Sequence, residues 1–303
     1  MTIREVALDL SAYAHASAPY HHLTVDVEEY FHVAAWESHI HRSDWSTMTS
    51  RIDIGLGSLL ELLERHGARA TFFVLGWLAE RRADLVRRIS DAGHEIASHG
   101  WNHMRVTELT PLRFRYSVRR ARGVLQSITG MDIAGFRAPS FSIVPGLEWA
   151  LETLVQEGHT YDSSIFPANG RRYGYPGARR DPYVIHCDAG SIVEMPPATL
   201  RCFGLNIPAA GGGYLRNFPL KVVSAAITSA ERRSAPATLY VHPWELDPEQ
   251  PRSPHSWGST IRHYTGLSRT ASRLERLLET FTVRPIADTM AGIAVPGPIS
   301  AGP

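Results

Sequence analysis

The chain has 303 residues, 44% of them hydrophobic and 20% charged, which is an ordinary globular composition and excludes disorder of the whole chain. A net charge of +1 argues against a nucleic-acid-binding protein and against a polybasic membrane anchor. No run of about 18 apolar residues is present, so no transmembrane segment is expected. The first 20 residues lack the apolar stretch of a secretory signal, so we expect a cytoplasmic location.

Strand and helix patterns alternate between an N-terminal arm expected to be flexible, residues 1–20, and a Gly/Pro-rich tail expected to be disordered, residues 289–303. Short apolar runs predict buried strands, and apolar residues at helical spacing followed by glycine predict helices. The expected elements are strand 23–27, helix 52–65, strand 70–76, helix 78–92, strand 94–100, helix 111–129, strand 133–139, helix 147–157 and strand 159–164. This alternation predicts a parallel sheet with helices outside it, within one domain over residues 21–288.

The pattern changes over residues 167–213, where turn residues dominate, as in PANGRRYGYPGARRDP and PAAGGGY. We expect an irregular insertion with short strands over one end of the sheet. The glycine triplet 211–213 predicts a turn or a close approach of the backbone to a substrate. The regular alternation then returns with helix 220–231, strand 237–243, helix 268–281 and strand 281–286.

Polar residues whose side chains could take part in catalysis or metal binding lie at the ends of five expected strands. They are Asp26, His99, Arg137, Asp162 and His242. In a parallel barrel, the C-terminal ends of the strands form one face, and active sites lie on that face. We therefore expect these five side chains to converge.

Two histidines, His99 and His103, lie four residues apart in SHGWNH. At the start of a helix these positions share one face, so both imidazoles could bind one metal ion. HxxxH alone is a weak signal, and the alternative is a pair of solvent-exposed or capping histidines.

The DVEE segment supplies a cluster of carboxylates. Asp26 and Glu28 alternate to the same side of an extended strand, which suits one as a metal ligand and the other as a base. A solvated acidic loop is the alternative, but the apolar residues that flank the cluster favour partial burial.

Three further polar residues could belong to the same site. Arg137 ends FRAP, and a buried arginine needs a carboxylate partner, which the DVEE segment could supply. His242 ends LYVHP and could instead be a core histidine bonded to a backbone carbonyl. Asp162, in TYDSS, could be a turn residue.

Aromatic residues near these positions could stack on sugar rings, although most aromatic side chains belong to the core. They are Tyr173, Tyr175, Tyr214 and Trp244. The sequence contains no GxSxG elbow, no P-loop and no dinucleotide fingerprint, so lipase, NTPase and Rossmann interpretations have no support.

Five segments resemble, in order and approximate spacing, the motifs of the polysaccharide deacetylases of carbohydrate esterase family 4, the NodB homology domain: TVDVEE, SHGWNH, FRAPSF, YDSS and LYVHP. The resemblance runs from about His22 to Ile286 and is closest to the subgroup linked to exosortase (PEP-CTERM) exopolysaccharide clusters. The sequence segments that resemble the motifs of that subgroup are TFFVLGWLAE, AGHEIASHGWNH, YDSSIFP, AGGGY, HPWELDPEQP and RHYTGL. The resemblance implies a distorted (β/α) barrel of about seven parallel strands with an irregular insertion and a C-terminal extension.

The family reaction is metal-dependent hydrolysis of an acetyl group on a sugar polymer. For this chain the resemblance implies that the substrate is an acetylated polysaccharide or its oligosaccharide precursor, with N-acetyl favoured over O-acetyl. It implies a divalent metal, Zn²⁺ by default, on Glu28, His99 and His103, with water in an open position.

The resemblance also implies the remaining roles. Asp26 would be the base, held by Arg137, and His242 the acid, oriented by Asp162. A backbone N–H near Ser140 would hold the oxyanion.

The chain departs from the family at its first motif, where two adjacent aspartates are usual and Val27 here follows Asp26. The alternate D-x-E spacing places the base at Asp26 and the metal carboxylate at Glu28, and the reverse assignment or the use of Glu29 remains open. Two other functions also remain open: a small-molecule amidase on the same scaffold, and a carbohydrate-binding protein without turnover. The sequence does not specify the glycan, the native metal or the oligomeric state.

Overall fold

Seven parallel strands form the centre of the computed structural model, which describes residues 3–14, 18–33, 36–37, 39–170, 173–252 and 263–293. The strands lie side by side in the order β11-β2-β3-β4-β5-β6-β8. Their bounds are β2 (His21–Val27), β3 (Thr71–Val74), β4 (Glu95–Ser98), β5 (Gly135–Phe136), β6 (Tyr161–Asp162), β8 (Gly190–Glu194) and β11 (Thr238–Val241). A short strand, β12 (Val283–Arg284), pairs with β2 in the same direction.

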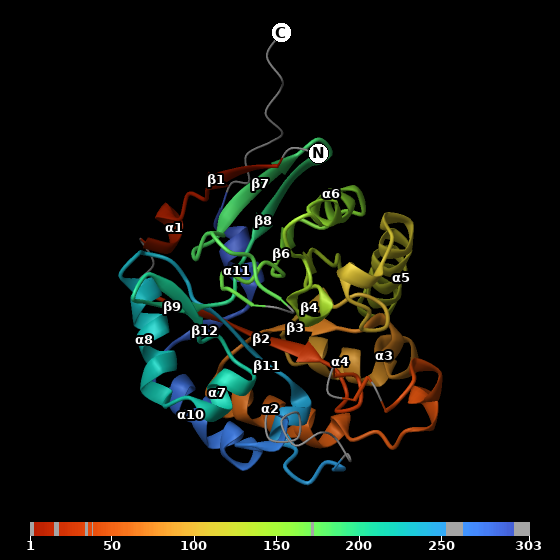
Figure 1. Ribbon diagram of the computed structural model, residues 1–303. Coiled ribbons are helices and arrows are strands. Elements are labelled where there is room, and N and C mark those ends of the chain that lie inside the picture. The colour runs from red at the N-terminus through yellow and green to blue at the C-terminus, as the bar shows by residue number, and fades with distance from the viewer. Residues whose placement is uncertain are drawn as a thin grey trace.

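The two ends of this row approach each other, since isolated bridges join Pro197 to Thr238 and Gly211 to Tyr240 of β11. Within the described residues no continuous ladder closes the row. The fold is thus the expected distorted (β/α) barrel, open between β8 and β11 (Figure 1). A Cβ atom on Gly211 would lie 1.7 Å from the carbonyl oxygen of Tyr240, so this glycine permits a close approach of the backbone to β11.

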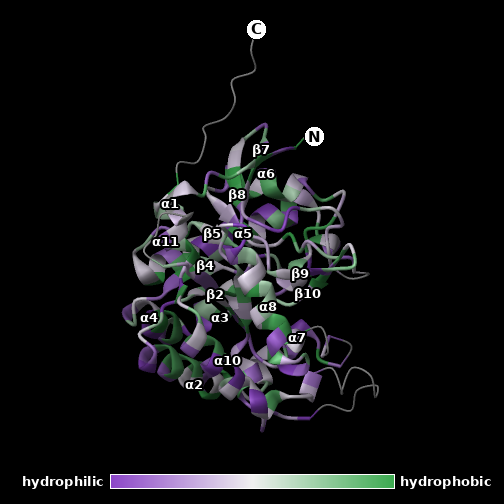
Figure 2. Ribbon diagram, turned by 90° about the vertical axis from the view of Figure 1, so that its left-hand side faces the viewer, coloured by the Kyte–Doolittle hydropathy of each residue, from purple (hydrophilic) through white to green (hydrophobic). Residues whose placement is uncertain are grey.

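Helices surround the sheet, and hydrophobic and hydrophilic residues alternate along them, as expected of amphipathic helices (Figure 2). The α-helices are α1 (Ser11–Ala14), α2 (Ile52–Arg65), α3 (Gly76–Arg81), α4 (Ala83–Asp91), α5 (Pro111–Thr129), α6 (Trp149–Gln156), α7 (Gly213–Asn217), α8 (Leu220–Glu231), α10 (Thr270–Thr280) and α11 (Ile286–Ala291). The 3-10 helices are η1 (Arg42–Thr47), η2 (Val106–Glu108), η3 (Pro139–Phe141), η4 (Pro243–Leu246) and η5 (Leu267–Arg269).

Local signals set the ends of α5 where the sequence predicts them. The Thr110 hydroxyl accepts a hydrogen bond from the Arg113 backbone, and Pro111 occupies the first turn. At the other end Gly130 adopts a left-handed conformation with φ of 69°. The predicted helix 78–92 is wrong in one respect: it breaks into α3 and α4 at Arg82, whose guanidinium binds the carboxylates of Asp53 and Asp84.

The expected flexible arm over residues 1–20 contains a strand instead. β1 (Arg4–Ala7) is the edge strand of the sheet and pairs antiparallel with β7 (Tyr183–Cys187), which lies between β1 and β8 (Figure 1). Three of the four residues of β1 are exposed, so backbone hydrogen bonds to β7 are what keep this strand in the sheet. For the same reason the sequence has no apolar alternation from which β1 could be predicted. At the other end α11 extends to Ala291, past the expected start of the tail at 289, and residues 294–303 lie outside the described part.

The insertion expected over residues 167–213 is more regular than its turn residues suggest. Strands β7 and β8 form an antiparallel hairpin, and β8 also pairs parallel with β6 as the seventh strand of the row. A second hairpin, β9 (Thr199–Cys202) and β10 (Leu205–Pro208), stands apart from the sheet. The short apolar runs in YVIHC and SIVE, flanked by turn residues, are the signal that could have revealed β7 and β8.

We expect Gly55→Ala to destabilise the protein, because a Cβ atom in α2 would lie 1.8 Å from the carbonyl oxygen of Pro243 in η4. Overpacking of this kind costs about 1–3 kcal/mol. Gly123→Ala in α5 is the matched control, since its Cβ would meet nothing within 4 Å and should add up to ~1 kcal/mol of helix propensity. Urea unfolding of both variants measures the difference, and equal stability would contradict the tight contact of α2 with η4.

Candidate active site

Asp26 lies near the end of β2 and accepts a hydrogen bond from Arg137, with 2.8 Å between Oδ1 and Nη1. The arginine side chain is fully buried, and it also donates to the hydroxyls of Thr24 and Ser163 at 2.7 and 2.8 Å. The structure therefore brings together the buried arginine and the DVEE carboxylate that the sequence suggested as its partner. Asp26 and Glu28 are both buried and border the same cavity.

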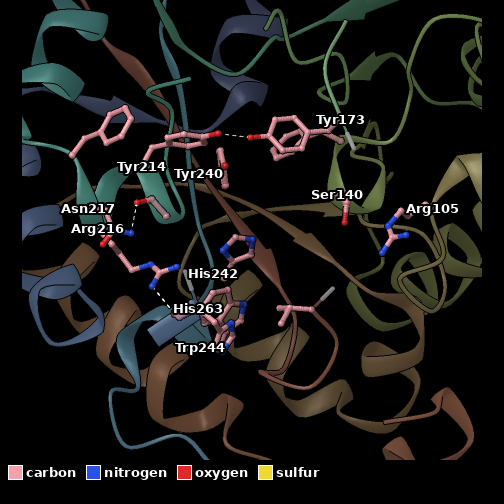
Figure 3. A pocket seen from close by; sticks show the side chains of 14 residues that line it. Arg105, Ser140, Tyr173, Tyr214, Arg216, Asn217, Tyr240, His242, Trp244 and His263 are labelled. Carbon is pink, nitrogen blue, oxygen red and sulfur yellow. Dashed lines mark hydrogen bonds between the residues drawn. The ribbon is translucent and has the colours of Figure 1, made fainter. Parts of the chain in front are cut away.

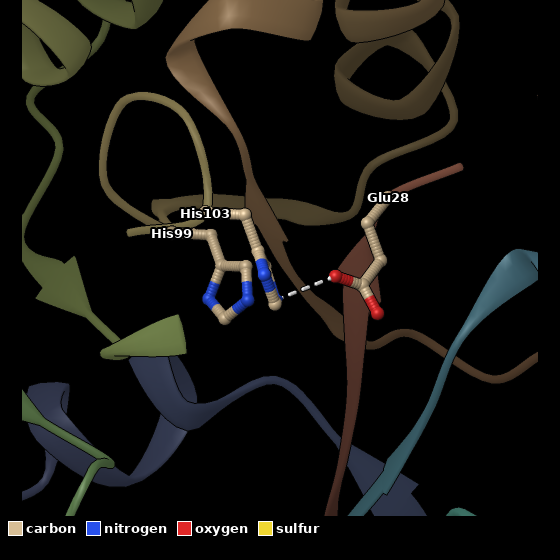
Figure 4. Close-up of side chains that lie close together, drawn as sticks. All are labelled: Glu28, His99 and His103. Carbon is tan, nitrogen blue, oxygen red and sulfur yellow. Dashed lines mark ion pairs between the residues drawn. The ribbon is translucent and has the colours of Figure 1, made fainter. Parts of the chain in front are cut away.

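Glu28, His99 and His103 form the one group of potential metal ligands among the described residues (Figure 4). One ligand atom from each lies within 4.8 Å of the others, and all three residues are buried. The carboxylate Oε2 of Glu28 is 2.8 Å from Nε2 of His103. Two imidazole nitrogens and a carboxylate oxygen are a suitable donor set for Zn²⁺ or a similar divalent ion.

The histidine pair lies on a loop, so the expected helix at this position is wrong. His99 directly follows β4, and the loop turns back at His103, whose φ is 55°. The two rings come within 5.6 Å of each other through this loop. The Nδ1 atom of His99 is 2.9 Å from the carbonyl oxygen of Arg137, a hydrogen bond that leaves Nε2 to face the cluster.

The electrostatic surroundings of Glu28 and His99 favour the protonation states in which these side chains can bind a metal ion. Burial opposes the charge of Glu28, but His103, His242 and His99 hold its pKa well below the usual range. Burial lowers the pKa of His99 to about 4, so its ring is neutral at physiological pH. A carboxylate and a neutral imidazole are the forms that bind a metal.

Glu29, the other acid considered as a metal ligand, has a different position. One of its carboxylate oxygens accepts a hydrogen bond from the Ser50 hydroxyl and the other from the Arg51 backbone at 3.1 Å. Glu29 thus binds the segment that leads into α2 and is not a member of the Glu28 cluster.

His242 directly follows β11 and contacts both carboxylates of the first motif. Its Nε2 atom is 3.5 Å from Oε1 of Glu28 and 3.8 Å from Oδ2 of Asp26. Its Nδ1 atom is 2.8 Å from Oε2 of Glu245. Burial alone would lower the pKa of His242, but the carboxylates of Glu245, Glu28 and Asp26 raise it to about 9.

The expected pairing of Asp162 with His242 is wrong, because Glu245 holds the Nδ1 atom. Asp162 accepts hydrogen bonds from the hydroxyl and backbone N–H of Ser164 at 2.6 and 3.2 Å, and it also bonds to Glu194. Burial raises the pKa of Asp162 to about 6 and that of Glu194 well above its usual range. The two acids are register partners at the ends of β6 and β8, and both are buried.

A cavity of about 160 Å³ connects these groups. It is lined by Asp26, Glu28, Val33, His99, His103, Ser140, Phe141, His242 and Trp244. Ser140 and Phe141 adopt left-handed conformations with φ of 57° and 52°, a local strain that is typical of functional sites.

A wider groove of about 450 Å³ adjoins this cavity (Figure 3). Residues that line both are Ser140, Phe141, His242 and Trp244. Tyr173 and Tyr214 are joined through their hydroxyls and line the groove, as does Trp244. Tyr175 is not among the lining residues, and its hydroxyl donates to Glu148. The aromatic lining suits the apolar faces of sugar rings.

Sequence reasoning missed Glu245 and Arg216. Glu245 stands three residues after His242 in HPWE, and that spacing at the start of a helical turn was the available signal. Arg216, in α7, donates from Nε to Oε1 of Glu245 at 2.6 Å. Nothing in its local sequence indicates that contact, which joins α7 to η4 across 29 residues of sequence.

Two family models match the chain. Residues 55–154 match the polysaccharide deacetylase model, and residues 163–291 match a model described as a domain of unknown function, DUF3473. The polysaccharide deacetylase model thus covers about a third of the chain.

Named relatives agree with this domain. A peptidoglycan deacetylase-like protein of Gibberella zeae is 31% identical over 140 residues, which cover 44% of this chain and 40% of that protein. A peptidoglycan-N-acetylglucosamine deacetylase of Bacillus cereus is 30% identical over 95 residues, which cover 31% of this chain and 34% of that enzyme. The chain therefore spans less than half the length of these relatives.

A crystal structure described as a candidate polysaccharide deacetylase of Mycobacterium smegmatis aligns over 100% of both chains, with a TM-score of 0.62 and 17% identity. This similarity shows that the two proteins share a fold. No helix among the described residues has the length and apolar character needed to cross a membrane.

The Asp162–Glu194 pair should make stability depend on pH. The pKa of a carboxyl is near 4 when unfolded, whereas burial raises it in the folded protein, so the folded state holds a proton that the unfolded state has lost. Stability should therefore fall as pH rises from about 4 through 6 and beyond, by up to about 1.4 kcal/mol per pH unit for each proton. Glu194→Gln should flatten this dependence.

Melting temperatures of both proteins between pH 5 and 8 measure this effect. Glu64→Gln, on the exposed face of α2, is the control and should follow the unmodified protein. A parallel decline in all three proteins would contradict the raised pKa values of Asp162 and Glu194.

Removal of a histidine of the cluster should remove bound metal. His99→Ala and His103→Ala each delete one of three ligand groups, so affinity should fall by more than the 10–100-fold typical of a lost outer-shell contact. Asp26→Asn should bind metal normally, and Glu28→Gln should bind it weakly. Calorimetric titration of the metal-free proteins with Zn²⁺ measures each affinity. Loss of metal in Asp26→Asn but not in Glu28→Gln would reverse the assignment of the two carboxylates.

Proposed function

We propose that the protein is a metal-dependent deacetylase that removes acetyl groups, N-acetyl in the first place, from a polysaccharide or its glycan precursor. The observation that carries the proposal is the shared cavity: Asp26, which is paired with Arg137, the Glu28–His99–His103 cluster and His242 all border it. The similarity to named deacetylases supports the same reaction class.

Glu28, His99 and His103 would hold the divalent ion, and zinc fits their donor set best. The metal would supply a water of lowered pKa and polarisation of the acetyl carbonyl. The cluster is buried and its His99 ring is oriented by a backbone carbonyl, as in metal sites whose outer contacts orient the ligands.

Asp26 is positioned to take a proton from an attacking water. Arg137 binds one of its oxygens, and the other oxygen remains on the side of His242 at 3.8 Å. The ion pair fixes the orientation of the carboxylate, as a general base requires.

His242 is positioned to protonate the leaving amine. Its Nε2 atom borders the cavity, and a pKa near 9 means that the ring carries a proton at neutral pH. The carboxylates that raise this pKa lie on both sides of the ring. Ser140, on the strained turn at the cavity wall, would offer its backbone N–H to the developing oxyanion. The products would be acetate and an amino sugar.

The groove beyond the cavity favours a sugar chain over a small amide, because it is about 450 Å³ and aromatic. The resemblance to the exosortase-linked subgroup suggests an exopolysaccharide or its precursor as substrate. The cytoplasmic location expected from the sequence stays a prediction.

Acetate release from a panel of acetylated polysaccharides and lipid-linked oligosaccharides tests the proposal. We expect release that stops on chelation and returns when Zn²⁺ is added. A metal-loaded, folded protein that binds the glycans but releases no acetate from any of them would instead be a carbohydrate-binding protein. Release only from small amides would favour an amidase.

The role of His242 predicts a dependence on the leaving group. An amine must be protonated as its C–N bond breaks, so His242→Ala should lower kcat on an N-acetyl substrate by ~10²–10⁴-fold. Metal content and KM should stay nearly unchanged, since the proton acts in the transition state. An activated acetyl ester needs the proton less and should show a smaller defect. Equal losses of kcat on both substrates would mean that His242 has a structural role.

A further inference from the structure

The 3-10 turn η4 directly follows His242 and contacts both halves of the candidate site. We propose that this turn contains two positioning residues: Glu245 fixes the ring of His242, and Trp244 fixes the carboxylate of Glu28. The inference rests on the proposed function. It adds two residues that do not act on the substrate themselves: Glu245 acts through His242, and Trp244 acts through Glu28.

Glu245 restrains the His242 ring from within the protein. Its side chain is fully buried, and its Oε2 atom lies 2.8 Å from the ring Nδ1 and 3.0 Å from the His242 backbone nitrogen. Its Oε1 atom accepts from Arg216 at 2.6 Å. With Nδ1 engaged, Nε2 is the ring nitrogen left to face the cavity.

Arg216 restrains Glu245 in turn. Its Nη1 atom donates to the backbone carbonyls of His263 and Thr265 at 2.6 and 2.9 Å. The arginine is 3% exposed, so it is a buried charge paired with a buried carboxylate. Removal of one partner of such a pair is costly, which keeps the arrangement in place.

Trp244 acts on the metal side of the same turn. Its indole Nε1 donates to Oε1 of Glu28 at 3.2 Å, while Oε2 of Glu28 faces His103. The indole stacks on the ring of His242, with 5.1 Å between ring centroids, and on the ring of His263, with 4.5 Å between centroids (Figure 3). The N–H therefore has a fixed direction and selects the oxygen that Glu28 turns toward the histidines.

The turn is itself held firmly. Pro243 opens it, and the carbonyl of Pro243 packs against Gly55 of α2, where a side chain would not fit. Two adjacent residues of this turn thus contact different partners: Trp244 binds Glu28, and Glu245 binds His242.

Glu245→Gln tests the first half of the inference. Glutamine offers one oxygen where His242 and Arg216 need two acceptors, so one partner must face an NH₂ group. We expect kcat on an N-acetyl substrate to fall about 10²-fold, with a smaller loss on an activated acetyl ester and no change in Zn²⁺ affinity. Glu95→Gln, a carboxylate bonded to Thr71 and Tyr161 in the same sheet, is the control and should change none of these.

Trp244→Phe tests the second half, because phenylalanine keeps an aromatic ring and removes the N–H donor. We expect Zn²⁺ affinity of the metal-free protein, measured by competition with a chelator, to fall about 10–100-fold. At saturating Zn²⁺, the ratio of amide to ester kcat should stay within about twofold of the unmodified protein. Trp149→Phe on α6 is the matched control.

The two variants should therefore separate metal affinity from leaving-group dependence. A loss of both properties in each variant, or of neither, would overturn the inference, and circular dichroism identifies any variant that fails to fold. Arg216→Met then serves as a second test of the first half and should reproduce the Glu245→Gln profile. Failure of the proposed function is a distinct result, since the unmodified protein would then release no acetate.

Discussion

The buried charge of Arg137 is the constraint on which the site depends. A fully buried guanidinium is stable only with a carboxylate and further acceptors, and Asp26, Thr24 and Ser163 provide them from β2 and from the segment after β6. The backbone carbonyl of the same arginine receives His99. One residue at the end of β5 thus fixes the orientation of the candidate base and of one candidate metal ligand, so their relative geometry follows from the packing of the sheet.

The departure at the first motif is consistent with the geometry. A strand alternates its side chains, so Asp26 and Glu28 share a face and Val27 turns to the other, where it is fully buried in the core. The D-x-E spacing therefore delivers two carboxylates to one cavity without a break in the strand pairing.

Much of this arrangement could be predicted from the sequence, because it depends on local signals. The positions of α2, α5 and α8 follow from their apolar periodicity, and the ends of α5 also follow from its capping residues. The convergence of Asp26, His99, Arg137 and His242 follows from parallel strands that end at one face. The rest depends on tertiary contacts. β1 is held by a ladder to a strand about 180 residues away, the partner of His242 is Glu245 and not Asp162, and the histidine loop closes through a left-handed residue that no helical spacing indicates.

The two matched family segments are parts of one structural and chemical unit. Residues 55–154 contribute His99, His103 and Arg137, whereas residues 163–291 contribute His242, Trp244 and Glu245. The second segment also supplies β8 and β11, the strands at the two ends of the parallel row, and β11 pairs directly with β2, which carries Asp26. A fragment limited to the first segment would lack both β2, with Asp26, and β11, and the cavity would lack its His242 side. The region described as a domain of unknown function is therefore better understood as the part of the barrel that supplies the two end strands of the row and faces the candidate metal ligands across the cavity.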